Sequence, residues 1–276
     1  MMKRLPLIVA LGLLLAGCGQ DKHNTWLGYA EGDNAFVSAP QAGWVTSVAV
    51  KRGDFVKPGD LLFTLDDPSQ TAARDAAEAA IAQAQGQMVQ AQANLELASK
   101  QLVRQQGLLR ANATSKQSYD LAKSSYDSAA AQIAQIRAAE NQARATLAGS
   151  AYQLSQRQIV ARTTGRVQDV YFRQGEYAAA MTPVVLILPP ENVYVRFFVP
   201  EGDFAKIHLG DKVAIGCDGC AKIKATISFI AAQEEFTPPV IFSVENRDKL
   251  VFKVEARAPG GLKLHPGQPV DVQPTN

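Results

Sequence analysis

Two hydrophobic periods divide the chain. In residues 34–65 and again in 159–188, apolar and polar positions alternate in short runs that end at turn residues, which predicts β-strands. In residues 67–157, apolar positions recur every seventh residue and glycine and proline are nearly absent, which predicts long helices. From Val193 onward, further alternating runs and one short helix predict a small antiparallel barrel.

The two strand regions repeat one motif. Four positions of the first copy recur in the second at a constant offset: Gly43 as Gly165, Val45 as Val167, Val48 as Val170, and Gly53 as Gly175. Neither copy is long enough to bury a core alone. We therefore expect the two halves to close over each other as one β-sandwich, with the helical segment inserted between them.

The helical segment predicts an antiparallel hairpin of two helices of about forty residues each, which would reach about 60 Å. Asp67 would cap the first helix with its side chain and Pro68 would open it, while Thr114 or Ser115 would cap the second helix. The larger residues at the sevenfold positions are Ile81, Met88, Leu95, Leu102 and Leu109, then Tyr119, Tyr126, Ile133, Leu147 and Leu154, with Glu140 as the one break. Mostly alanines line the adjacent row, so we expect a narrow coiled-coil seam of small and larger layers.

The hairpin has two interpretations. One is a rigid dimerisation arm, and the other is a tube-forming arm whose outer faces pack against copies of itself. The polar faces are rich in Gln, Ala and Ser and poor in charge. This composition favours close lateral packing, because interface cores are depleted in charged residues.

The N-terminus predicts secretion. A basic start and a short apolar run lead to Leu15-Ala-Gly-Cys18, as in a secretory signal, and the run is too short to span a bilayer. Leu-Ala-Gly-Cys resembles the lipobox of bacterial lipoproteins, which implies that Cys18 is acylated and anchors the chain to a membrane. Gly19 follows Cys18 where the familiar inner-membrane retention signal has an aspartate. The alternative is an ordinary signal peptide with an incidental cysteine.

Charge and composition exclude several functions. The formal charge is +2, and Lys3 and Arg4 belong to the predicted signal, so the mature chain is near neutral and offers no electrostatic footprint for nucleic acid. The sequence has no paired Ser/His or Cys/His, no phosphate-binding glycine loop and no metal-ligand cluster. We therefore predict a protein that is not an enzyme and has no cofactor.

Two of the three cysteines enclose a turn. Cys217-Asp-Gly-Cys220 has strand-like sequence on both sides, and with Cys18 acylated these two form an even pair in an oxidising compartment. We expect a disulfide across the turn, which would contribute only about 2 kcal/mol because the loop is so short. A thioredoxin-like redox motif would need a βαβ context, and a zinc site would need two more ligands.

Each strand repeat resembles one half of a biotinyl/lipoyl domain. Lys57 lacks the flanking residues of a carrier tip, and the helical hairpin after Asp66 stands where a carrier has its modified lysine. A split lipoyl fold that is interrupted by a coiled coil and followed by a β-barrel resembles the HlyD-type periplasmic adaptor (membrane-fusion) family over nearly the whole mature chain. The runs 235–243, 247–252 and 264–269 resemble adaptors that serve ABC-type exporters, and the Cys-Asp-Gly-Cys turn is familiar in that branch.

The fold class is thus mainly β with a long α-helical coiled-coil hairpin: a split lipoyl/biotinyl-like β-sandwich plus a small antiparallel β-barrel. The expected domains are a lipoprotein signal peptide (1–17), a tether (18–33), the first lipoyl half (34–66), the hairpin (67–157), the second lipoyl half (158–189) and the barrel (190–276).

The predicted hairpin tip carries a motif. Arg104-Gln-Gln-Gly-Leu108 is followed after six residues by Ser115, which is similar to the Arg-x3-Leu-x6-Ser/Thr pattern of adaptors that dock on TolC-type outer-membrane channels. The resemblance implies that Arg104 contacts polar groups at the channel mouth, Leu108 packs between channel helices and Ser115 adds a polar contact. In the alternative, Arg104 is solvated, Leu108 packs within the hairpin and Ser115 only caps a helix.

The resemblance implies a lipid-anchored adaptor on the periplasmic face of the inner membrane. It would assemble as a hexamer and link an ABC-type exporter to a TolC-like channel. Three other classes compete with this interpretation: a lipoyl-type carrier, a redox protein that uses Cys217 and Cys220, and a periplasmic scaffold without a transport role.

Overall fold

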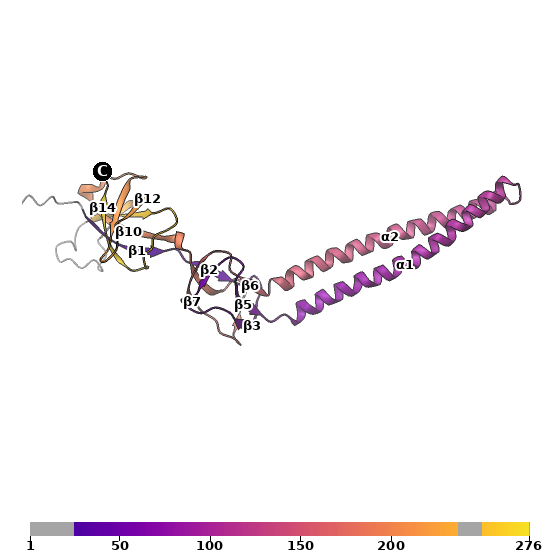
Figure 1. Cartoon of the computed structure of the whole chain (residues 1–276), viewed down its shortest axis with the longest axis horizontal. Coiled ribbons are helices and arrows are strands. Elements are labelled where there is room, and N and C mark those ends of the chain that lie inside the picture. The colour runs from indigo at the N-terminus through magenta and orange to yellow at the C-terminus, as the bar shows by residue number, and fades with distance from the viewer. Residues whose placement is uncertain (1–24, 237–249, 276) are drawn as a thin grey trace, which may run out of the picture. The chain divides into compact units, whose positions relative to one another are not determined.

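The computed structural model describes residues 25–236 and 250–275. The chain divides into two compact units, of which one contains the barrel and the other contains the sandwich and the hairpin (Figure 1). The predicted signal peptide and Cys18 lie outside the described residues.

The β-sandwich consists of two four-stranded sheets, and each sheet draws on both halves of the motif. The first half supplies β2 (Ala35–Ser38), β3 (Gly43–Val48), β4 (Phe55–Val56) and β5 (Leu61–Leu65). The second half supplies β6 (Gln158–Val160), β7 (Gly165–Val170), β8 (Tyr177–Ala178) and β9 (Pro183–Leu188). The sheet orders are β2-β9-β7-β4 and β6-β5-β3-β8, so each half contributes two short strands to the sheet centred on the other half.

The repeat seen in the sequence reappears in the hydrogen bonds between the halves. The Gly53 amide donates to the Val167 carbonyl at 2.8 Å, and its counterpart Gly175 donates to the Val45 carbonyl at 2.8 Å. Val45 and Val167 are each 1% exposed and lie in the core. Both glycines have positive φ angles, 95° and 88°, a conformation that costs other residues about 1–2 kcal/mol. The same glycine turn therefore occurs once in each half of the sandwich.

The hairpin consists of α1 (Pro68–Arg110) and α2 (Lys116–Ser155), which lie side by side (Figure 1). In the small layer of the expected seam, Ala84, Ala91 and Ala122 are buried, and the other alanines of the layer are buried or half-buried. The larger sevenfold residues of both helices are half-buried at its edges. The seam therefore follows the predicted register.

The structure confirms one of the two predicted helix caps and contradicts the other. The Ser115 hydroxyl oxygen accepts a hydrogen bond from the Ser118 amide at 3.1 Å and so caps α2. Pro68 opens α1 as predicted, but the Asp67 side chain makes no capping hydrogen bond. Instead, the Asp67 backbone carbonyl accepts from the Thr71 amide at 2.9 Å.

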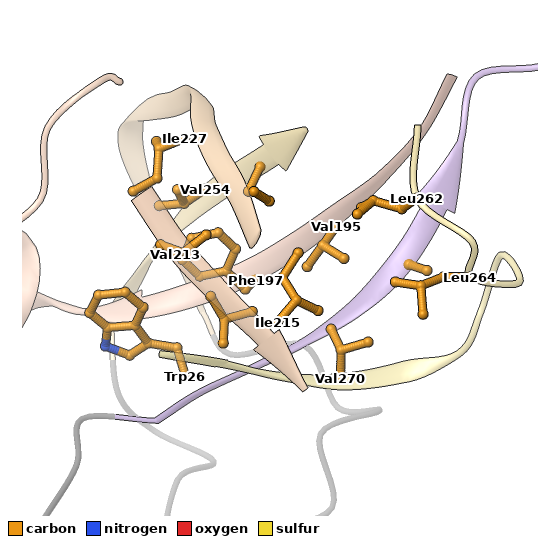
Figure 2. Close-up of a cluster of buried hydrophobic side chains, with 14 of the residues drawn as sticks. Trp26, Val195, Phe197, Val213, Ile215, Ile227, Val254, Leu262, Leu264 and Val270 are labelled. Atoms are coloured by element: carbon orange, nitrogen blue, oxygen red, sulfur yellow. The ribbon is translucent and has the colours of Figure 1, made fainter. Parts of the chain in front are cut away.

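The other unit is a closed six-stranded antiparallel barrel in the order β1-β10-β13-β12-β11-β14. Its strands are β1 (Trp26–Gly32), β10 (Val193–Pro200), β11 (Lys212–Gly216), β12 (Ile223–Phe236), β13 (Leu250–Arg257) and β14 (Pro269–Pro274). Two short helices, η1 (Pro190–Asn192) and α3 (Glu201–Phe204), flank β10. Figure 2 shows the core, where Val195, Phe197 and Ile215 are fully buried.

Strand β1 corrects the prediction that residues 18–33 are only a tether. Residues 26–32 pair with β10 and β14 and close the barrel. Trp26 is buried and stacks on Phe197 with ring centroids 5.6 Å apart. The reason for the error is that both partners of this strand lie more than 160 residues later in the sequence, so no local pattern announces the pairing.

A polar cluster holds β1 to its neighbours on the barrel. Arg196 bridges Glu31 at 2.7 Å and Glu255 at 2.9 Å, and the Tyr194 hydroxyl donates to Glu31 at 2.7 Å. Partial burial and the hydrogen bond to Glu31 raise the pKa of Tyr194 above its ordinary value, so Tyr194 remains a donor. The cluster joins β1, β10 and β13 by directional contacts.

Candidate docking and assembly surfaces

The hairpin tip is a short turn that hydrogen bonds hold in place. The Ala113 amide donates to the Leu108 carbonyl at 2.8 Å, and Asn112 adopts a left-handed conformation with φ of 55°. Across the tip, the Thr114 hydroxyl donates to the Gln105 side-chain oxygen at 2.9 Å. This last contact, which no sequence pattern indicated, ties the start of α2 to α1.

The three predicted docking residues surround this turn. Arg104 and Leu108 lie one helical turn apart on α1 and are both exposed, with 37% of Leu108 accessible. The neighbouring Leu109 is the residue that enters the seam, so Leu108 is not part of the hairpin core. Ser115 caps α2, as the alternative interpretation states, and its hydroxyl also lies 2.9 Å from that of Ser118.

One face of the hairpin is hollowed by two contiguous grooves. No charged side chain lines either groove. Alanines and serines form much of the lining, and its amides come from Gln87, Gln90, Asn94, Gln101, Gln132 and Gln135. We call this surface the amide face. It is unlike an ordinary solvated helix surface, where lysine and glutamate predominate.

Charge lies elsewhere on the hairpin. A separate groove lies nearer the start of α1 and the end of α2, and its lining includes Glu78 and Arg144. Glu140, the break in the sevenfold pattern, is paired with Arg144 at 2.7 Å, and this hydrogen bond lowers the pKa of the Glu140 carboxyl. The uncharged surface is therefore a local property of the amide face.

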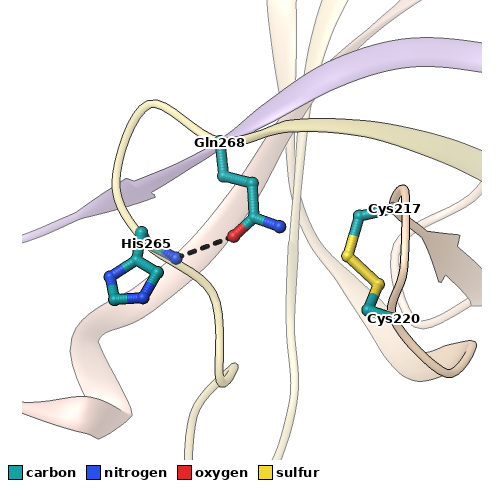
Figure 3. Close-up of a disulfide and its surroundings, with 4 residues drawn as sticks. All are labelled: Cys217, Cys220, His265 and Gln268. Atoms are coloured by element: carbon teal, nitrogen blue, oxygen red, sulfur yellow. Dashed lines mark hydrogen bonds between the residues drawn. A yellow bond between two sulfur atoms is a disulfide. The ribbon is translucent and has the colours of Figure 1, made fainter.

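The turn between β11 and β12 holds the two remaining cysteines. The sulfur atoms of Cys217 and Cys220 are bonded, and their Cα atoms lie 5.3 Å apart (Figure 3). Figure 3 also shows His265, whose backbone amide donates to the Gln268 side chain at 3.1 Å. The cysteines lie in a β-turn and not at a helix N-terminus, the setting that activates thiols in redox motifs.

Two further features bear on function. Within residues 25–236 and 250–275, no three His, Cys, Asp or Glu side chains converge as metal ligands would. In the same residues, neither long helix is apolar enough to cross a bilayer.

Comparisons with known proteins agree with this architecture. Residues 80–157 match the family described as RND MFP, alpha-helical hairpin domain. The chain is 31% identical over 181 residues to the macrolide export protein MacA of Yersinia pestis, covering 64% of this chain and 49% of that protein. It is 31% identical over 194 residues to an uncharacterised protein of Haemophilus influenzae, covering 70% of this chain and 43% of that protein.

A solved structure has the same fold. The crystal structure of MacA from Actinobacillus actinomycetemcomitans superimposes with a TM-score of 0.71 at 21% identity, covering 91% of this chain and 78% of that one. The hairpin is therefore related to the helical hairpin domain of membrane fusion proteins, and the rest of the chain shares the MacA-like fold. The chain spans about half the length of the curated relatives it matches, from 43% to 60% of each.

The turn disulfide yields the first prediction. Replacing Cys217 and Cys220 together with serine should lower the free energy of unfolding by at most about 2 kcal/mol, because the closed loop is short. Urea denaturation measures the change. As a control, a reductant should destabilise the parent protein and leave the double variant unaffected. Two freely reactive thiols at these positions in native protein would contradict a structural disulfide.

Proposed function

We propose that this chain is the periplasmic adaptor subunit of a tripartite efflux or secretion system. It would link an inner-membrane exporter, of the ABC type, to a TolC-like outer-membrane channel. The observation that carries the proposal is the long hairpin with Arg104 and Leu108 exposed at its tip, in a segment that matches the hairpin domain of membrane fusion proteins. The export role printed for the MacA relative supports it.

The proposed mechanism is structural. Helix α1 has 43 residues and so spans about 65 Å. A rod of this length projecting from a sandwich, with a barrel in the same chain, suits a spacer that holds two membrane proteins together. A carrier function is disfavoured because the helical hairpin, which begins just after Asp66, stands where a carrier has its modified lysine. A scaffold without a transport role is the second candidate.

The tip provides the test that separates these candidates. Leu108→Ala should reduce crosslinking of the hairpin to the outer-membrane channel at least tenfold, since a truncated interface leucine costs a few kcal/mol and about 1.4 kcal/mol is tenfold in affinity. Arg104→Glu should act in the same direction, because a reversed charge would meet groups suited to a cation. Both variants should keep the parent melting temperature, since both side chains are exposed.

Leu109→Ala is the matched control. Leu109 is adjacent in sequence but enters the seam, so its truncation should lower the melting temperature. Normal crosslinking and export by both Leu108→Ala and Arg104→Glu would overturn the docking proposal and leave the hairpin as a structural arm.

We further propose that Cys18 is the acylated first residue of the mature protein and holds it at the periplasmic face of the inner membrane. Cys18→Ser should release the chain into the soluble periplasmic fraction or leave an uncleaved precursor. Fractionation with mass spectrometry of the N-terminal peptide measures this. A Cys18→Ser protein that is processed and stays on the membrane would rule out the lipid anchor.

The amide face supports a homo-oligomer, which we propose to be a hexamer with this face buried between copies. Gln90 is exposed and lines a groove of the amide face, whereas Gln92 is exposed but lines neither groove. Gln90→Lys should weaken assembly, because it places charges in a contact without counter-charges, and Gln92→Lys should not. Light scattering and in vivo crosslinking report the oligomer. Equal assembly of both variants would show that the amide face is not the contact.

A further inference from the structure

Arg157 is the buried charged side chain among the described residues, with only 8% of its surface exposed. It lies two residues after the end of α2, where the hairpin returns to the sandwich. Its guanidinium donates from Nη1 to the Ala42 carbonyl at 2.8 Å, and its own carbonyl accepts from the Leu65 amide at 2.8 Å. Arg157 therefore joins the returning chain to the segment before β3 and to the end of β5.

A glycine makes room for this arrangement. A Cβ atom on Gly43 would stand 2.7 Å from Arg157 Nη1 and 2.6 Å from Asp66 Oδ1. Asp66 also accepts from the Trp44 amide at 2.7 Å, so a carboxylate lies in the same space as the buried guanidinium. Gly43, Asp66 and Arg157 together form what we call the hairpin junction, because Asp66 precedes α1 and Arg157 follows α2.

Stability alone does not explain the junction. The Arg157 Nε atom is buried without a hydrogen-bond partner among the described residues, and leaving a buried polar group unpaired costs about 1–3 kcal/mol. A well-packed apolar side chain in such a place is often neutral or stabilising. A charged residue at this position is accounted for if its role depends on the direction in which the guanidinium donates its hydrogen bond.

The repeat of the sandwich supplies an internal comparison. Gly165 is the counterpart of Gly43, but a Cβ atom on Gly165 would stand 2.6 Å from Ile187 Cγ2 and 2.6 Å from the Leu188 carbonyl oxygen. Leu188, the counterpart of Asp66, belongs to the barrel core. Two equivalent ends of one sandwich thus differ in chemistry. The neighbours of Gly165 are an apolar side chain and backbone, whereas Gly43 lies against a guanidinium and a carboxylate, whose hydrogen bonds are directional.

We propose that Arg157 is the positioning residue that fixes the orientation of the hairpin on the sandwich. The hairpin amplifies any freedom at its base, because a rotation of about 10° there would move a tip about 65 Å away by roughly 10 Å. Loss of the Arg157 hydrogen bond would therefore leave the sandwich and the hairpin folded, but the tip would occupy a wider range of positions relative to the sandwich. The proposal concerns the chain alone and goes beyond the proposed adaptor function, which supplies only its biological consequence.

The test measures the distance between the sandwich and the hairpin in the full-length protein. Spin labels at Lys57→Cys on the sandwich and Gln92→Cys on α1 both occupy exposed positions. Double electron–electron resonance should give a narrow distance distribution in the parent and a clearly broader one in Arg157→Leu, while circular dichroism shows unchanged helix content. Arg162→Leu, which removes an exposed arginine of the same unit, is the matched control and should leave the distribution narrow.

Two further variants keep the test decisive if Arg157→Leu does not fold. Arg157→Lys keeps the charge but loses the forked geometry, and Gly43→Ala pushes a methyl group against Arg157 and Asp66. Either should broaden the distribution. An unchanged distribution in folded junction variants would overturn the inference and leave Arg157 a structural residue. The distances involve no channel, so this result is independent of crosslinking at the tip.

Discussion

Neither half of the sandwich can complete its own sheets, and the rest of the unit depends on this constraint. Each half pairs two of its own strands, β3 with β5 and β7 with β9, but β4 pairs with β7 and β8 pairs with β3, so each sheet is completed by short strands of the other half. The paired bonds of Gly53 and Gly175 repeat the same exchange on both sides. Because burying unpaired amides and carbonyls is costly, the two halves are expected to fold together or not at all. The inserted hairpin must therefore bring residue 158 back to residue 65.

An antiparallel coiled coil meets that requirement, because its two ends lie side by side. The seam achieves this with alanines, which allow the helices to approach closely, and it leaves the outer surfaces free for other contacts. No charged side chain lines the grooves of the amide face, and Glu140, a charged residue at a sevenfold position of α2, is paired with Arg144. The hairpin thus separates the residues of its internal packing from two exposed surfaces, the amide face and the tip at Leu108.

Periodic features were predictable from the sequence, and long-range features were not. The sevenfold seam, the Ser115 cap and the repeated turn at Gly53 and Gly175 all have local patterns, and each appears in the structure. The pairing of β1 has no local signal, because Trp26–Gly32 is short and its partners are distant in sequence. The role of Arg157 has no local signal either, since the carbonyl that its guanidinium binds belongs to Ala42, 115 residues away. The exposure of Arg104 and Leu108 at the tip could be inferred from the heptad register, but the contacts proposed for them depend on a partner whose structure this sequence does not encode.

The neighbouring ends of the hairpin have a consequence for evolution. The Leu65 amide donates to the Arg157 carbonyl at the base of the hairpin. This contact does not depend on the length of the two helices. The seam repeats every seven residues, and removing one heptad from each helix would shorten the rod by roughly 10 Å and keep every layer in register. The length of the hairpin can therefore change in steps of one heptad. Paired insertions or deletions can therefore change the length of the hairpin without changing the residues that join it to the sandwich.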